Sequence, residues 1–207
     1  MIFKMYKRIV NKLLKHFEEK TIPSENDVVY LTFDDGPEPG ITEFVLEELA
    51  KYNFKATFFC RGDNAEKYPE LLERIREQGH AVANHTYSHI DVYDVSSKDY
   101  LDDVERANTI LKTSLFRPPH GTLNLVTWMR LRKKYRIFFW SLGSGDAELD
   151  KFDYQRSIGI LKSNTKRGDI VLFHFCHRHE RETTKVLPDY LMWLSENGYR
   201  CDVILSR

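Results

Sequence analysis

The stretch TFDDGP at residues 32–37 directly follows the apolar run VVYL at residues 28–31. We expect a strand that leads into two adjacent carboxylates and ends at a Gly-Pro pair. Successive side chains of a strand point to opposite faces, so Asp34 and Asp35 cannot do the same work. One can hold a metal while the other faces a bound water, and a cation would relieve their repulsion. A solvated turn is the alternative, because Asp, Gly and Pro are common turn residues.

Length and composition indicate one sizeable domain without a nucleic-acid partner. The chain has 207 residues, with Lys+Arg and Asp+Glu both 31, and a sequence pI of about 7.1. Basic residues are therefore not in excess, and the charge gives no indication of a nucleic-acid partner. The strongest apolar runs, such as 170–173, are far shorter than the roughly 20 residues needed to cross a bilayer. The odd set of Cys60, Cys176 and Cys201, with no CxxC pair, is typical of a protein without structural disulfides.

The first twenty residues differ from the remainder in their charge. Basic residues precede the first acid, Glu18, and apolar residues recur at steps of three and four, which predicts an amphipathic helix. Lysines interrupt this segment throughout, so it is not a secretory signal, and the cytoplasm or a membrane face is favoured as the location. Two interpretations stay open for residues 1–20: peripheral contact with an anionic membrane, or packing on the chain's own domain. We divide the chain into residues 1–22, this helix and its linker, and residues 23–207, one catalytic domain.

From residue 28 onward, strand-like and helical patterns alternate. Strands are expected at residues 28–33, 55–60, 80–84, 115–117, 136–142, 169–173 and 199–204. Helices are expected at about 41–51, 68–78, 97–113, 123–134, 152–164 and 180–197, with Ser96 or Ser97 as the cap of the third. This alternation predicts an α/β fold with a parallel sheet covered by helices.

Several polar groups follow these strands. HTYSH at 85–89 places two imidazoles four residues apart, so on a helical turn both rings would share a face. Two histidines and one carboxylate suit a transition metal and leave positions open for water, although polar lining is the alternative. Arg117 stands before two prolines that fix its backbone, and its guanidinium can clamp a carboxylate. A surface arginine in a Pro-rich turn is the plain alternative.

Two further residues end later strands. The segment WSLGSGD ends on Asp146, and the apolar run 170–173 ends on His174, which in isolation is more typical of a core histidine. All of these groups follow different strands at their carboxyl ends, where barrel-like α/β folds gather catalytic residues. An open sheet would spread them in a line. We therefore expect a closed or nearly closed barrel.

Together the motifs TFDDGP (32–37), HTYSH (85–89), RPPHG (117–121), the segment ending in Asp146, and LFH (172–174) resemble the NodB-homology polysaccharide deacetylases, carbohydrate esterase family 4. The resemblance implies a distorted (β/α)7 barrel, TIM-like in outline. It also implies hydrolysis of an acetyl group, most often N-linked, from a saccharide or glycan such as peptidoglycan or chitin-like oligomers. A divalent metal, most often zinc and otherwise cobalt or nickel, would be the cofactor.

The resemblance also implies residue roles. Asp35, His85 and His89 would bind the metal, and Asp34 would be the base for a metal-bound water. Arg117 would orient Asp34, the backbone N–H of His120 would bind the oxyanion, and Asp146 would tune His174 as the general acid. Zinc with three protein ligands and an open position suits this chemistry. A serine nucleophile is not favoured, because the sequence has no GxSxG elbow.

The sequence departs from many relatives at a few positions. Gly143 and Ala147 stand where an Asp and a Trp are common, His120 where Tyr is common, and Phe175 where some relatives are polar. These departures leave open a deacylase or deformylase of a small or lipid-linked amino sugar, or a non-catalytic carbohydrate-binding relative. Cys176-His177-Arg178-His179 is either an accessory metal site or, as we favour, a solvated loop. Trp140 is the aromatic residue expected at the mouth of the site.

Overall fold

The computed structural model describes residues 13–14, 16–148 and 151–205. Most of the predicted basic helix over residues 1–20 lies outside this part of the chain, so its form and any membrane contact stay predictions. The division into residues 1–22 and 23–207 stays a prediction as well. Within the described residues, no helix combines the length and the apolar character that a bilayer span requires.

The strands form one parallel sheet, and most of them lie where the hydrophobic pattern predicts. Their bounds are β1 (Val28–Asp34), β2 (Ala56–Cys60), β3 (Ala81–Asn84), β4 (Leu115–Phe116), β5 (Arg136–Ile137), β6 (Leu142–Gly143), β7 (Ile170–His174) and β8 (Arg200–Cys201). They follow the order β5-β4-β3-β2-β1-β7-β6, and β8 pairs with β1 beside this series. All of these pairs are parallel.

The single strand expected at residues 136–142 is wrong, and the difference explains how the sheet closes. The segment divides into β5 and β6, which lie at the two ends of the strand series. Between them, the carbonyls of Phe138 and Phe139 accept hydrogen bonds from the Arg117 side chain. Residues 138–141 span at most about 14 Å when extended. The two edges of the sheet must therefore approach each other, which confirms the distorted (β/α)7 barrel.

Residues 19–22 form a second connection across the gap in the sheet. The Glu19 carbonyl accepts a hydrogen bond from the Phe139 N–H at 2.8 Å, and the Ile22 N–H donates to the Gly168 carbonyl at 2.8 Å. The Glu19 carboxylate also pairs with Arg136 at 2.7 Å. This short segment therefore links the end of β5 to the residues that precede β7.

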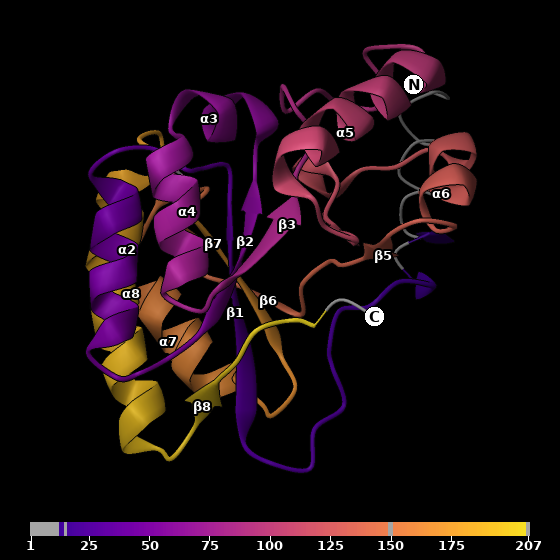
Figure 1. The fold of residues 1–207 in the computed structure, drawn as a ribbon. Coiled ribbons are helices and arrows are strands. Elements are labelled where there is room, and N and C mark those ends of the chain that lie inside the picture. Colours follow the sequence, from indigo (N-terminus) through magenta and orange to yellow (C-terminus); the bar gives the residue numbers. More distant parts are fainter. Residues whose placement is uncertain (1–12, 15, 149–150, 206–207) are drawn as a thin grey trace.

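The helices cover the outside of the curled sheet. Their bounds are α2 (Ile41–Ala50), α3 (Gly62–Lys67), α4 (Pro69–Glu77), α5 (Ser97–Leu111), α6 (Leu125–Leu131), α7 (Tyr154–Asn164) and α8 (Glu180–Glu196). All were expected except the short α3. Ser96 is the cap of α5, as predicted, because its hydroxyl accepts a hydrogen bond from the Asp99 N–H at 3.2 Å. In Figure 1, α2, α4, α7 and α8 lie to the left of β1 and β2, and α5 and α6 lie to the right.

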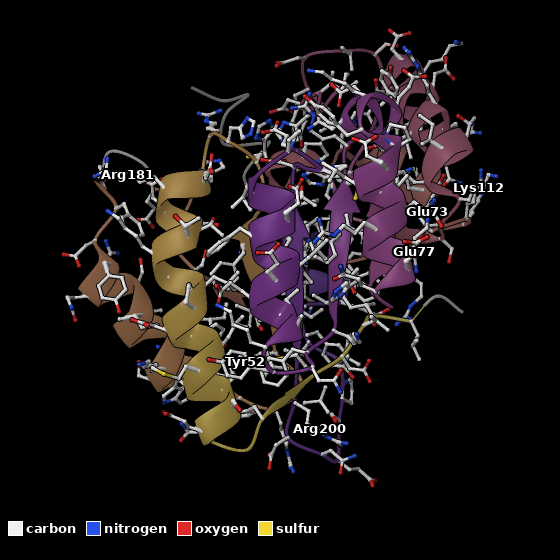
Figure 2. The ribbon with its side chains drawn as sticks, turned by 60° about the vertical axis from the view of Figure 1, so that its left-hand side comes forward. Tyr52, Glu73, Glu77, Lys112, Arg181 and Arg200 are labelled. Atoms are coloured by element: carbon white, nitrogen blue, oxygen red, sulfur yellow. The ribbon has the colours of Figure 1, made fainter. Side chains whose placement is uncertain are left out.

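The helices run opposite to the strands, which defines the two ends of the barrel. Figure 2 shows α8 beside α2, with Arg181 near its start at the upper end and Tyr52 and Arg200 toward the lower end. The arrows of β2 and β3 point upward in Figure 1. The carboxyl ends of the strands and the start of α8 therefore lie at the same end of the molecule.

An aromatic cluster fills the core directly beneath this end. Phe33, Phe58, Phe173 and Phe175 are fully buried, and the rings of Phe33 and Phe58 stack with centroids 5.1 Å apart. A Cβ atom built on Gly36 would lie 2.4 Å from the ring of Phe175 and 2.6 Å from its carbonyl oxygen. The glycine that follows Asp35 is therefore required by the close approach of the chain after β7.

The contact between Gly36 and Phe175 generates a stability prediction. We expect Gly36→Ala to destabilise the protein by about 1–3 kcal/mol, because the methyl group would overlap buried backbone and ring atoms. Gly159→Ala is the matched control, since Gly159 lies in α7 with no atom within 4 Å of the added Cβ. That control should stabilise by about 0.5–1 kcal/mol, as alanine favours the helix. Urea unfolding of both variants measures the difference, and equal stabilities would contradict the packing described.

Candidate active site

The residues to which the family resemblance assigns a role meet at the carboxyl end of the barrel. Asp34 ends β1, His85 follows β3, Arg117 follows β4, and His174 ends β7. A cavity of about 340 Å³ opens there and is lined by Asp34, Asp35, His85, His89, His120, Trp140 and His174, among others. Arg117 and Asp146 lie fully buried behind its wall. The geometry brings the predicted set together, and the chemical role of each member stays a prediction.

The Asp34 carboxylate is fixed by a buried guanidinium. Arg117 Nη1 donates to Asp34 Oδ1 at 2.7 Å and to the Thr32 hydroxyl at 2.9 Å. The Arg117 side chain is 0% exposed, and it lies 4.0 Å from the centre of the Phe59 ring. The alternative of a surface arginine is therefore excluded. The Arg117 side chain cannot move without breaking several buried hydrogen bonds, and it therefore fixes the orientation of Asp34.

The two histidines approach each other without the helical turn that would also have brought their rings to one face. Residues 85–89 form a compact loop in which Thr86 and His89 have φ values of 66° and 58°. The His89 N–H donates to the Thr86 hydroxyl at 3.0 Å, which holds the loop. The rings of His85 and His89 consequently lie with their centroids 5.1 Å apart.

Asp35 faces both imidazoles. It adopts a φ of 84° at the end of β1, and its Oδ1 lies 3.3 Å from His85 Nε2 and 3.0 Å from His89 Nε2. Burial alone would raise the pKa of the Asp35 carboxyl, but the two neighbouring imidazoles lower it well below its ordinary value. Asp35, His85 and His89 therefore form a compact group of potential metal ligands.

The tautomer of His85 shows that a cation fits this group. His85 Nδ1 lies 2.8 Å from the Arg117 carbonyl, which can only accept, so Nδ1 carries the proton. In the neutral imidazole, Nε2 then directs a lone pair toward Asp35 Oδ1. That oxygen is buried and receives no hydrogen bond from any described residue. Two acceptors that face each other in a buried site repel, and a proton or a metal cation between them relieves this repulsion.

His174 is paired with a buried carboxylate on the other side of the cavity. Its Nδ1 lies 3.0 Å from Asp146 Oδ1, and Asp146 Oδ2 accepts hydrogen bonds from the His174 N–H at 2.7 Å and the Thr183 hydroxyl at 2.9 Å. Burial alone would lower the pKa of His174, but the negative charge of Asp146 raises it to about 9. His174 is therefore protonated at neutral pH.

His120 and Trp140 lie at the rim of the cavity. His120 has a φ of 57°, and its backbone N–H has no backbone partner among the described residues. Trp140 lines the cavity, which confirms its expected place at the mouth. Ala147, one of the departures from the family pattern, also lines the cavity. Phe175, another departure, points away from the cavity and into the core.

The interpretation of residues 176–179 as a solvated loop is correct for half of them only. His177 and Arg178 are exposed, but Cys176 and His179 are buried. The His179 ring lies 4.6 Å from the His174 ring and lines the cavity together with Arg178. A cysteine and a histidine three residues apart follow directly after a strand that ends at the site. This spacing is the signal in the sequence that could have placed Cys176 and His179 beside the cavity.

A larger cavity of about 700 Å³ lies at the opposite end of the strands. Its lining includes Ala81 at the start of β3, Leu115 at the start of β4, and Ile204. No residue singled out in the sequence contributes to it. Volume alone therefore does not identify the chemical site, and the convergent polar groups of the smaller cavity do.

Comparisons with known proteins agree with this geometry. Residues 21–135 match the family model described as polysaccharide deacetylase. A peptidoglycan-N-acetylglucosamine deacetylase of Bacillus cereus is 29% identical over 185 residues, which cover 86% of this chain and 87% of that protein. A chitooligosaccharide deacetylase of Sinorhizobium fredii is 45% identical over 154 residues, which cover 70% of this chain and 71% of that one. The chain spans only 48% and 39% of two other peptidoglycan deacetylases that it matches.

A solved structure shares the whole architecture. The Bc1960 peptidoglycan N-acetylglucosamine deacetylase, in complex with a substituted N-hydroxybenzamide, superposes with a TM-score of 0.82 at 28% identity, covering 89% of each chain. The family model spans more than half of the sequence, and the fold agrees along nearly all of it. The chain therefore belongs to the polysaccharide deacetylase family, carbohydrate esterase family 4.

Proposed function

We propose that this protein is a metal-dependent hydrolase that removes an N-linked acetyl group from a saccharide such as peptidoglycan or a chitin-like oligomer. One observation carries the proposal: a carboxylate and an imidazole, Asp34 and His174, each fixed by its own buried partner, flank a compact group of one carboxylate and two imidazoles in one cavity. Two relatives are named peptidoglycan-N-acetylglucosamine deacetylase and chitooligosaccharide deacetylase, and these names support the substrate class. The bond cleaved would be a C–N amide bond other than a peptide bond.

Asp35, His85 and His89 would hold the metal, for which zinc is the best fit to two imidazoles and one carboxylate. When bound, such a metal polarises the acyl oxygen and lowers the pKa of water. The Arg117 carbonyl supports this assignment, because it fixes the tautomer that directs His85 Nε2 toward the metal position. Cobalt and nickel accept the same ligands.

Asp34 would take the proton from the attacking water. Arg117 holds Oδ1 of Asp34 at 2.7 Å, while Oδ2 lies on the side of the ligand group, 3.8 Å from His85 Nε2. A base fixed at one oxygen and available at the other meets the geometric requirement of general base catalysis. The water oxygen then bonds to the acyl carbon as its proton passes to Asp34.

The backbone N–H of His120 would donate to the oxyanion that forms on the acyl oxygen. Its lack of a backbone partner and its position at the cavity support this role. A donor that is already oriented before the reaction stabilises charge as it develops. The two prolines before His120 hold that peptide group in place.

His174 would donate a proton to the amine nitrogen as the C–N bond breaks. An amine leaves poorly as an anion, so a protonated group close to the nitrogen is required. Asp146 keeps His174 in its charged form at neutral pH, because it raises the pKa of the imidazole to about 9. The products are acetate and a free amino sugar.

The base assignment predicts the effect of Asp34→Asn. Zinc-dependent acetate release from an N-acetylglucosamine oligomer should fall by about 10²- to 10⁴-fold, because asparagine cannot accept the proton. The zinc content of the variant should equal that of the unaltered protein, since Asp34 is not among the proposed ligands. Asp202→Asn, the same change at an exposed position, should leave the rate unchanged.

Acetate release is measured by an enzyme-coupled assay, and zinc by elemental analysis. Full activity in Asp34→Asn would rule out Asp34 as the base. Absence of acetate release from the zinc-loaded, unaltered protein, across peptidoglycan fragments and chitooligosaccharides, would refute the proposed function.

The acid assignment predicts the effect of Asp146→Asn on the pH dependence. In the unaltered protein, kcat/KM should decline as the pH rises through about 9, where His174 loses its proton. Without the Asp146 charge, burial dominates and lowers the pKa of His174, so the decline should begin at lower pH. The same pairing stabilises the fold below pH 6.5, and that contribution is lost as the pH rises through about 9. An unchanged alkaline limb in Asp146→Asn would separate His174 from the proton transfer.

A further inference from the structure

The two oxygens of the Asp35 carboxylate face different groups of side chains. Oδ1 lies close to the Nε2 atoms of His85 and His89. Oδ2 lies on the other side, 3.9 Å from Cys176 Sγ. A ring nitrogen of His179, Cys176 Sγ and a carboxylate oxygen of Asp35 lie within 4.8 Å of one another. A single carboxylate is therefore shared by two compact groups of potential metal ligands.

The second group is buried. Cys176 is 5% exposed and His179 is 6% exposed. His179 Nδ1 is enclosed and has no hydrogen-bond partner among the described residues. Leaving a buried polar atom unpaired is unfavourable, because the atom has lost its hydrogen bonds to water. A ligand that accepts the lone pair of an imidazole nitrogen would remove this cost.

The local backbone fixes the two side chains on the same side of the cavity. The chain turns immediately after β7, where the His179 N–H donates to the Cys176 carbonyl at 3.0 Å. His179 then becomes the cap of α8, a 17-residue helix with one buried face, which anchors its position. The ligand atoms therefore belong to a turn that is held at both ends by regular structure.

A thiolate, an imidazole and a carboxylate form a donor set that suits zinc or cobalt(II). In sites with two metals, the ions commonly lie about 3.5–4 Å apart and act on the same substrate. We propose that Asp35, Cys176 and His179 form a second metal site, which shares the Asp35 carboxylate with the site of Asp35, His85 and His89. The first of these sites rests on the proposed function, and the second does not. Binding at the second site releases the thiol proton of Cys176 to the solvent as the metal–sulfur bond forms.

The test measures bound metal on the full chain, after chelator treatment and equilibrium dialysis against zinc or cobalt(II) alone. We expect two ions per chain in the unaltered protein. Cys176→Ser and the double variant Cys176→Ser/His179→Ala should each retain one ion. His85→Ala/His89→Ala should also retain one, held by Asp35, Cys176 and His179.

The cobalt(II) form supplies a second readout, because a thiolate ligand produces a sulfur-to-cobalt charge-transfer absorption. This absorption should appear in the unaltered protein and in His85→Ala/His89→Ala, and it should be absent from Cys176→Ser. Cys201→Ser is the matched control, since Cys201 is also buried but lies on β8 away from the cavity. It should keep the absorption.

The outcomes separate the two sites. One ion per chain that is unaffected by Cys176→Ser, or an absorption that survives this change, would overturn the second site and leave the proposed function intact. One ion with a thiolate absorption that persists in His85→Ala/His89→Ala would support the second site and refute the metal assignment of the first. Circular dichroism of each variant confirms that a lost ion does not reflect a lost fold.

Discussion

The buried ion pair between Arg117 and Asp34 is the interaction on which the rest of the site depends. The Arg117 side chain donates to β1 through Thr32 and Asp34, and to the carbonyls of Phe138 and Phe139. Its own carbonyl lies at hydrogen-bond distance from His85 Nδ1. A guanidinium removed from water is strongly unfavourable without such partners, and removal of one partner from a buried pair costs about 3–5 kcal/mol. One residue therefore closes the barrel and fixes the carboxylate through its side chain, and sets the histidine tautomer through its carbonyl.

The charges of the site follow from this arrangement. Asp34 is balanced by Arg117, and Asp146 is balanced by His174. Among the described residues, Asp35 forms no ion pair with a lysine or arginine side chain, and its neighbours are the imidazoles of His85 and His89. A metal ion would complete the balance at the one carboxylate that lacks a counter-charge. The site thus holds Asp34 and His174, the proposed base and acid, in place on either side of the position proposed for a cation.

The sequence predicted most of the fold, because buried parallel strands appear as continuous apolar runs and because polar groups at their carboxyl ends must meet. It did not predict the division of residues 136–142, since the pattern stays apolar while distant hydrogen bonds from Arg117 decide the path. The spacing of His85 and His89 fits a helical turn, but the positive φ values of Thr86 and His89 bring the rings together in a compact loop. Tertiary contacts override the local pattern in both cases.

The sequence also predicted only some residues of the candidate site. Asp34, His85 and Arg117 stand in motifs whose residue types and order restrict the chemistry. For Cys176 and His179 the sequence indicates only a short loop after a strand. Their burial depends on how the start of α8 packs beside β7. Such packing has no periodic pattern in the sequence. The residues that follow a strand into a site therefore require the structure before they can be assigned to solvent or to the cavity.

An anomalous diffraction map at the zinc absorption edge, from crystals of the zinc-loaded protein, tests the metal site most directly. We expect a peak about 2.0–2.2 Å from a carboxylate oxygen of Asp35 and from Nε2 of His85 and His89. Asp34 should lie beside that peak, still held by Arg117. Well-ordered density for these side chains with no peak between them would contradict the central claim that this chain builds a metal-dependent hydrolytic site.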